Sequence, residues 1–180
     1  MGITGENIRN IAVIGHSGEG KTTLCEAMLF NGGTTDRQAK VLDGTTVTDF
    51  DELEKSKKMS IYTACAYLHW KGTKINLLDL PGFYDFEGER HEGLRAAGGA
   101  LLVIGVLPIG AESVVDYCLR LGKPLIIFIN GMDKENADYF GTVRALKEKY
   151  SGKLAPIQIP IMENGKMQGC INALQEKAYR

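Results

Sequence analysis

The sequence predicts a three-layer α/β fold in which helices cover both faces of a mostly parallel central sheet. Two observations carry this prediction. Short apolar runs of the buried-strand type alternate with segments whose apolar residues recur at helical spacing. The first apolar run, Ile8–Ile14, ends at a glycine-rich loop, Gly15–Thr22, and a helical segment follows directly. Such alternation favours parallel strands that are joined by crossover helices.

The loop after the first strand fits the phosphate-binding pattern GxxxxGK[ST]. Its glycines let backbone N–H groups turn toward one point, and the helix N-terminus adds partial positive charge. We therefore predict a P-loop NTPase in which Lys21 reaches the outer phosphates and the Thr22 hydroxyl binds Mg²⁺. A glycine-rich turn with a surface lysine is disfavoured, because chance matches to this pattern are rare. The predicted phosphate-binding residues are His16, Ser17, Gly18, Glu19, Gly20, Lys21, Thr22 and Thr23.

The remaining elements are predicted in chain order. Residues 31–59 are polar and lack sustained apolar periodicity, which is typical of a functional or mobile segment. Residues 61–70 and 74–79, joined by a short turn, are expected to form an antiparallel edge pair. Helices are expected over 87–99, 111–121 and 138–150, and buried strands over 100–106 and 124–129. From Ala155 onward we expect a β-hairpin with its turn at Asn164-Gly165.

Composition and charge disfavour several classes of function. A chain of 180 residues that is 44% hydrophobic can form a globular domain with a core. The net charge of −1 provides no general footprint for nucleic acid, so no sequence-specific DNA contact is expected. The longest apolar stretch, 100–109, is too short to span a bilayer, and no signal peptide is expected before Ile8. The four scattered cysteines favour reduced thiols in a cytoplasmic protein.

Polar residues follow two predicted strands, at the edge of the sheet where α/β proteins bind ligands. Asp79-Leu80-Pro81-Gly82 is a DxxG pattern, in which Asp79 can hold Mg²⁺ through water and the Gly82 N–H can meet a γ-phosphate. Asn130-Gly131-Met132-Asp133 resembles the guanine-reading motif NKxD, whose carboxylate, here Asp133, accepts two hydrogen bonds that adenine does not offer. Each motif alone is weak evidence. In this order behind the glycine-rich loop, they indicate a GTPase that binds GTP or GDP with Mg²⁺.

Longer stretches resemble the GTP-binding domain of bacterial elongation factor G, and more closely its elongation factor G-like paralogues. The stretches are Asp43–Phe50, Met59–Ile61, Asp79–Phe86, Pro156–Ile161 and Lys177–Arg180. The resemblance implies that residues 31–60 are switch I, with Ser60 in place of the threonine that closes on Mg²⁺. Residues 79–92 are then switch II, which the γ-phosphate orders. The implied partner is the ribosome, and the implied location is the cytoplasm.

The resemblance also implies a domain organisation. Residues 1–154 are expected to form the GTPase domain, and residues 155–180 the start of a subdomain that the family inserts at this point. The family's Ser-Ala loop, which contacts guanine from the other side, has no counterpart after Asp133. We therefore expect the sheet to be incomplete at its C-terminal end, and the chain to be the N-terminal part of a longer translation factor. The sequence leaves the oligomeric state open.

Three substitutions depart from the family's pattern. Phe83 stands where a histidine orients the attacking water, so no residue is assigned a catalytic role and hydrolysis is expected to be slow and partner-dependent. Gly131 replaces a lysine whose stem lies over the base, a loss of roughly 1–2 kcal/mol, or about tenfold in affinity. Gly18 replaces a common aspartate and stays compatible with phosphate binding.

The sequence is compatible with three functions. The first is a translational GTPase domain that couples GTP hydrolysis to the ribosome. The second is a degenerate GTP-binding sensor with little or no hydrolysis, which Phe83 and Gly131 support. The third, an unrelated P-loop ATPase or kinase, leaves residues 130–133 unexplained. Whether the parent protein translocates, recycles or protects ribosomes is not decided by this sequence.

Overall fold

The computed structural model describes residues 4–105, 110–150 and 154–180. The chain divides into two compact units. The first consists of residues 1–104 and 109–128, and the second of residues 105–108 and 129–180. The first unit contains the glycine-rich loop, and the second begins where the last strand of the central sheet ends.

The central sheet has five strands in the order β2-β3-β1-β4-β5. Strand β1 pairs in parallel with β3 and with β4, and β2 pairs antiparallel with β3 at one edge. The predicted fold class, an α/β protein with a mostly parallel sheet, is therefore confirmed. The strands are β1 (Ile8–Ile14), β2 (Ala64–Trp70), β3 (Thr73–Asp79), β4 (Gly99–Ile104) and β5 (Leu125–Ile129). The last residue of the strand predicted over 100–106 lies outside the described residues.

Strand β2 begins three residues later than predicted. The N–H groups of Ile61 and Tyr62 donate to the Glu54 carboxylate, and the N–H of Thr63 donates to Glu89. Because these donors are already satisfied by side chains, the backbone enters the strand ladder only at Ala64.

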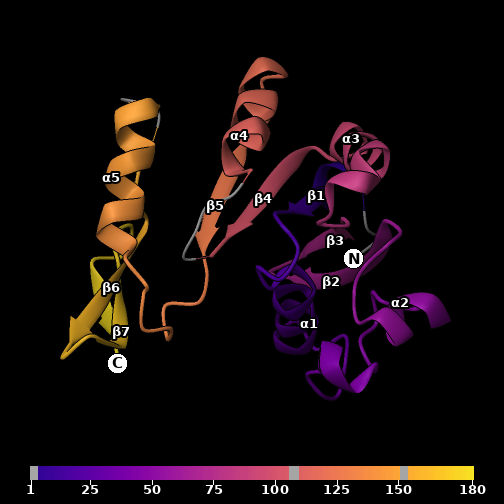
Figure 1. The fold of residues 1–180 in the computed structure, drawn as a ribbon, viewed down its shortest axis with the longest axis horizontal. Helices are drawn as coiled ribbons and strands as arrows, with labels where there is room; N and C mark the ends of the chain where they lie inside the picture. Colours follow the sequence, from indigo (N-terminus) through magenta and orange to yellow (C-terminus); the bar gives the residue numbers. More distant parts are fainter. Residues whose placement is uncertain (1–3, 106–109, 151–153) are drawn as a thin grey trace. The chain divides into compact units, whose positions relative to one another are not determined.

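Helices cover both faces of the sheet. Figure 1 shows α1 (Lys21–Asn31) on one side of the strands and α3 (Glu87–Ala96) and α4 (Ala111–Arg120) on the other. On α1, Cys25, Glu26 and Leu29 are fully buried, whereas Leu24 and Met28 are only partly buried. The core beneath α1 consists of Val13, Cys25, Leu29, Ala66, Leu68, Leu77 and Val103.

The polar segment 31–59 contains structure that hydrophobic periodicity does not predict. It holds a 3₁₀ turn, Val41–Asp43, and a short helix, α2 (Glu52–Lys57). Asp51 accepts from the Leu53 N–H at 2.8 Å, and Glu54 accepts from the Asp51 N–H at 3.2 Å. This reciprocal capping box stabilises a helix of only six residues. Two further 3₁₀ turns are Gly5–Asn7 and Tyr84–Phe86.

The second unit contains a helix and a separate antiparallel sheet. Helix α5 (Tyr139–Lys149) begins at Asp138, whose carboxylate accepts from the Gly141 N–H at 2.8 Å. Strands β6 (Gln158–Glu163) and β7 (Lys166–Asn172) form the predicted hairpin, and Asn164 and Gly165 both have positive φ. A third strand, β8 (Lys177–Tyr179), was not predicted. The division into domains at residue 154 stays a prediction.

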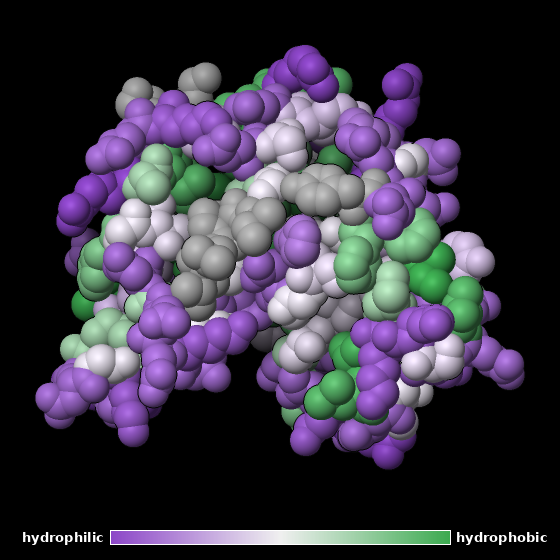
Figure 2. Space-filling model, viewed as in Figure 1, coloured by the Kyte–Doolittle hydropathy of each residue, from purple (hydrophilic) through white to green (hydrophobic). Residues whose placement is uncertain are grey.

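Within the described ranges, no helix has both the length and the apolarity needed to cross a membrane. Figure 2 shows hydrophilic residues over much of the visible face, with hydrophobic residues in separate groups. Scattered groups of this size are ordinary for a protein surface.

Candidate functional site

The glycine-rich loop connects the buried end of β1 to the first turn of α1. Gly20 precedes the helix in the left-handed conformation, with φ +90°, which a residue with a side chain rarely adopts. The Lys21 side chain folds back along the loop, and its Nζ donates to the His16 carbonyl at 3.0 Å. Lys21 is only 6% exposed, and burial lowers its pKa, although the charge of Asp79 opposes this shift. A buried ammonium group in this position gains from a nearby anion such as a phosphate.

The three predicted metal ligands lie together beside this loop. Thr22 Oγ1 donates to Asp79 Oδ2 at 2.8 Å, and the hydroxyls of Thr22 and Ser60 are 3.2 Å apart. Asp79 is 1% exposed, and its second oxygen, Oδ1, has no hydrogen-bond partner among the described residues. Hydroxyl and carboxylate oxygens are the donors that Mg²⁺ prefers. The cluster therefore fits the predicted magnesium ion, which would also satisfy the buried Oδ1.

Gly82 brings the end of the DxxG segment against the loop. A Cβ atom at this position would lie 2.5 Å from Lys21 Nζ and 2.5 Å from the backbone nitrogen of Ser17. No residue with a side chain fits there without a shift of its neighbours. Phe83, the next residue, is partly buried. The structure thus brings the loop, the cluster of Thr22, Ser60 and Asp79, and Gly82 together within the first unit.

Two further polar residues of the cluster were not predicted. Thr48 Oγ1 donates to Asp79 Oδ2 at 2.9 Å, so this oxygen accepts from two hydroxyls. The Asp49 carboxylate accepts from Ser60 Oγ at 2.7 Å and, with its other oxygen, from Thr46 Oγ1 at 3.3 Å. Ser60 is therefore held beside Thr22 by Asp49. Both residues lie within the stretch that resembles elongation factor G, which was the only available signal for them.

Two buried glutamates fix the backbone around Ser60. Glu26, on α1, accepts from the Val47 N–H at 2.6 Å, and Glu54, on α2, accepts from the Ile61 and Tyr62 N–H groups at 2.8 and 3.0 Å. Both glutamates are fully buried. Because charged acceptors form strong hydrogen bonds with backbone donors, these contacts tie residues 47–62 to the loop side of the sheet.

Burial raises the pKa of Asp79 to about 6, although hydrogen bonds from Thr22 and Thr48 and the charge of Lys21 oppose the shift. Between an unfolded pKa of 3.8 and a folded pKa of about 6, the folded chain binds more protons at this group than the unfolded chain does. The free energy of unfolding therefore falls as the pH rises through this window. At pH values above this window, the ionised Asp79 carboxylate lowers the free energy of unfolding by a constant amount, on the order of 3 kcal/mol.

We accordingly expect Asp79→Asn to raise the free energy of unfolding near neutral pH in buffer without Mg²⁺, and to flatten its dependence between about pH 4 and pH 6. The amide oxygen can still accept from Thr22 and Thr48. Urea unfolding at a series of pH values measures the effect, with Asp43→Asn, at an exposed position, as the control. A variant that is less stable than the parent near neutral pH would contradict this account.

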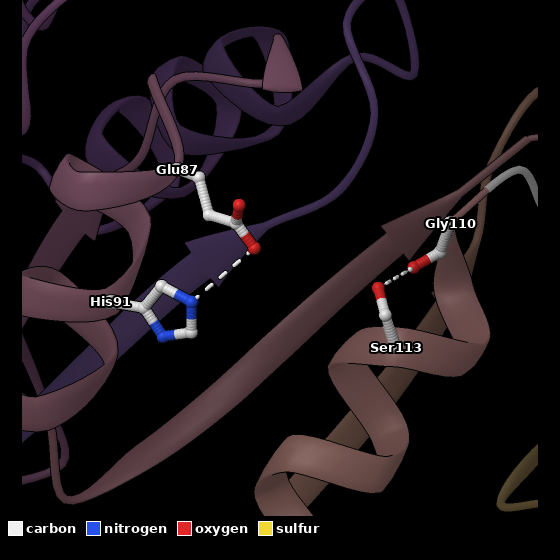
Figure 3. A network of polar contacts seen from close by, with 4 residues as sticks. All are labelled: Glu87, His91, Gly110 and Ser113. Atoms are coloured by element: carbon white, nitrogen blue, oxygen red, sulfur yellow. Dashed lines mark hydrogen bonds and ion pairs between the residues drawn. The ribbon is translucent and has the colours of Figure 1, made fainter. Parts of the chain in front are cut away.

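Helix α3 follows Gly82 and Phe83 and borders a cavity against α4. Figure 3 shows His91 and Glu87 one turn apart on α3, with Nε2 and Oε1 3.4 Å apart, and Ser113 donating to the Gly110 carbonyl at the start of α4. The cavity has a volume of about 390 Å³ and shares no lining residue with the glycine-rich loop. It is lined by Glu87, Arg90, His91, Leu94, Ser113, Val114, Asp116, Tyr117 and Arg120.

The predicted base-reading residues Asn130 and Asp133 belong to the second unit. They lie in the turn that follows β5, where Gly131 has φ +72° and its carbonyl accepts from the Lys134 N–H at 3.0 Å. The Asp133 side chain is exposed, as a carboxylate that reads a ligand must be. Its role in base recognition stays a prediction.

Comparisons with known proteins identify the family of the chain. The model of the elongation factor Tu GTP binding domain family matches residues 6–178. An elongation factor G-like protein from Thermotoga maritima is 35% identical over 178 residues, 97% of this chain and 25% of the relative. A mitochondrial ribosome-releasing factor 2 from Anopheles gambiae is 38% identical over 175 residues, 96% of this chain and 24% of the relative.

A solved structure shows the same fold. A crystal structure of a protein from Thermus thermophilus has a TM-score of 0.89 and 37% sequence identity to this chain. The match covers 98% of this chain and 27% of that chain. The chain thus spans about a quarter of the length of the relatives that it matches.

Proposed function

The chain belongs to the elongation factor Tu GTP binding domain family, and from this premise we propose that it binds GTP or GDP with Mg²⁺ in an elongation factor G-like translational GTPase. The parent protein would hydrolyse GTP to GDP and phosphate in response to the ribosome. The observation that supports this proposal best is the meeting of Thr22, Ser60 and Asp79 beside the glycine-rich loop. These residues come from three separate segments of the chain, and all of them offer oxygen ligands.

Each part of the site in the first unit has a separate task in this proposal. The backbone N–H groups of residues 16–23 hold the phosphates, and the Lys21 ammonium neutralises the outer ones. The Thr22 and Ser60 hydroxyls and the Asp79 carboxylate would hold the metal. A bound Mg²⁺ would supply positive charge against the phosphates. The Gly82 N–H would donate to the γ-phosphate, which the absence of a side chain permits.

Base recognition is assigned to the second unit. The Asp133 carboxylate would accept from the two donors on one edge of guanine, with Asn130 beside it in the same turn. A site built on such hydrogen bonds rejects bases that cannot make them, because its own polar group is then left unpaired.

The ribosome would act on the site through the two switch segments. Ser60 is held by Asp49, and the backbone after it is held by Glu54, so movement of this segment would withdraw a metal ligand. Loss of the γ-phosphate contact at Gly82 would release the second segment. The names of relatives that include elongation factor G and ribosome-releasing factor 2 support a ribosomal partner for the parent. A cytoplasmic location of the parent is part of the proposal, although that ribosome-releasing factor 2 is named as mitochondrial.

A competition titration tests the nucleotide assignment. The chain is saturated with a fluorescent GDP derivative in Mg²⁺ buffer, and GTP, GDP and ATP are titrated against it. We expect GTP and GDP to displace the probe at concentrations up to about 10⁴-fold lower than ATP. Equal displacement by GTP and ATP would refute the role of Asp133.

Phe83 supports the alternative of a GTP-binding sensor, because a phenylalanine ring cannot take or give a proton. We expect Phe83→His to speed single-turnover hydrolysis of bound GTP by about 100-fold, the lower end of what a general base contributes. Phe83→Leu, which restores no proton-transfer group, serves as the control. A histidine variant no faster than the parent, with and without ribosomes, would show that position 83 does not limit hydrolysis.

A further inference from the structure

Lys134 lies over the glycine of the base-reading turn. A Cβ atom built on Gly131 would be 3.3 Å from both Cδ and Cε of Lys134 and 3.6 Å from its Nζ. The turn itself brings the two residues together, because the Lys134 N–H donates to the Gly131 carbonyl at 3.0 Å. The methylene groups of Lys134 therefore occupy the space beside residue 131 that a side chain at that position would fill.

Among the residues that the structure describes, no charged partner holds the Lys134 side chain in this conformation. Within the described part of the chain, the Lys134 ammonium group has no ion pair or side-chain hydrogen bond, and the residue is exposed. A lysine in water usually extends its charged end away from the backbone, whereas here the stem lies close against the turn. The stem thus presents apolar surface at Gly131, within the same turn as Asp133.

A purine base has two kinds of surface that a protein can use. Its edge carries the hydrogen-bonding groups, and its two faces are flat and weakly polar. A carboxylate can engage only the edge, so binding gains further free energy when apolar groups cover a face. A lysine stem is suited to this task, because its methylenes pack on flat apolar surface while the ammonium group stays in water.

We propose that the methylene stem of Lys134 covers one face of the guanine base that Asp133 reads. This proposal rests on the proposed function and adds to it a residue that determines affinity. Position 131 has no side chain, and its φ of +72° lies in the left-handed region that residues with a side chain rarely adopt. Covering surface must therefore come from elsewhere in the turn, and Lys134 is the residue whose side chain lies there.

The proposal is tested with Lys134→Ala and Lys134→Met. The dissociation constant of a fluorescent GDP derivative is measured directly on each variant, and inhibition constants of the competitors are calculated from its displacement. Alanine removes the stem and should weaken binding of GTP and of inosine triphosphate by the same factor, about tenfold, because both bases present the same faces. Methionine keeps an apolar stem without the charge and should bind within about threefold of the parent. Lys147→Ala, at an exposed position on α5, should match the parent.

Inorganic tripolyphosphate separates base packing from damage to the fold. It has no base, so its inhibition constant should be the same for Lys134→Ala as for the parent, once the weaker binding of the guanine-containing probe to the variant is taken into account. Parental affinity of Lys134→Ala for GTP would overturn the proposal, and so would a methionine variant as weak as the alanine variant. A parent chain that binds neither GTP nor GDP would instead overturn the proposed function, so the two failures are distinguishable.

Discussion

Lys21→Met is expected to reduce nucleotide affinity by at least about 100-fold while leaving the fold intact. The substitution removes two or more charge-assisted hydrogen bonds to phosphate, each worth about 1.5–3 kcal/mol, and each 1.4 kcal/mol is tenfold in affinity. Methionine is close to lysine in length and can fill the buried position. Because burial already lowers the pKa of Lys21, loss of the charge also relieves a desolvation cost. The melting temperature should therefore change little, because the lost attraction between Lys21 and Asp79 offsets this gain.

Isothermal titration with GDP and Mg²⁺ measures this effect, and thermal unfolding of the same samples checks the fold. Lys57→Met is the matched control, because Lys57 is an exposed lysine at the end of α2. It should bind GDP as the parent does. Tight binding by Lys21→Met would show that the glycine-rich loop is a structural turn and not a phosphate site.

Asp133→Ala is expected to abolish the preference for guanine over adenine nucleotides. The variant loses both hydrogen bonds to the base edge, so a preference of up to about 10⁴-fold should fall to near unity. The GTP affinity itself should fall by about 100-fold or more. Affinity for ATP should rise, because an adenine base no longer leaves the carboxylate unpaired in the complex, and this rise contributes the rest of the lost preference. Competition titrations with GTP and ATP on the variant measure both quantities.

Asp138→Ala provides a control in the same segment. The Asp138 carboxylate accepts from the Gly141 N–H and caps α5, so its loss should cost about 1 kcal/mol of stability. It should leave the ratio of GTP to ATP affinity unchanged. If Asp138→Ala altered that ratio as strongly as Asp133→Ala, the selectivity would reflect the shape of the whole turn and not one carboxylate.

The parts of the fold that sequence predicts are those with local signals. Strand β1, the loop and α1 follow from one apolar run and one motif, and the β2–β3 pair follows from two strand-like runs with a short turn between them. The grouping of Thr22 with Asp79 follows as well, because parallel strands end at the same edge of a sheet. The motif order thus predicted the centre of the site.

The features of the structure that the sequence does not predict depend on contacts between residues that are distant in the chain. Helix α2 is too short for apolar periodicity, and only the pairing of Asp51 with Glu54 could have revealed it. Glu26 and Glu54 are charged residues that are fully buried, which composition alone argues against. Their burial is explained by backbone donors that lie seven or more residues away. Thr48 meets Asp79 across 31 positions of sequence.

The proposed function requires that GTP hydrolysis at the site of Thr22, Ser60 and Asp79 is coupled to the ribosome. The most direct test is multiple-turnover release of phosphate from GTP by the full-length protein, with and without ribosomes. We predict slow release from the protein alone, because Phe83 provides no proton-transfer group, and a clear increase with ribosomes that Lys21→Met abolishes. No release under either condition, from a protein that binds GTP tightly, would contradict the account and identify a nucleotide sensor instead.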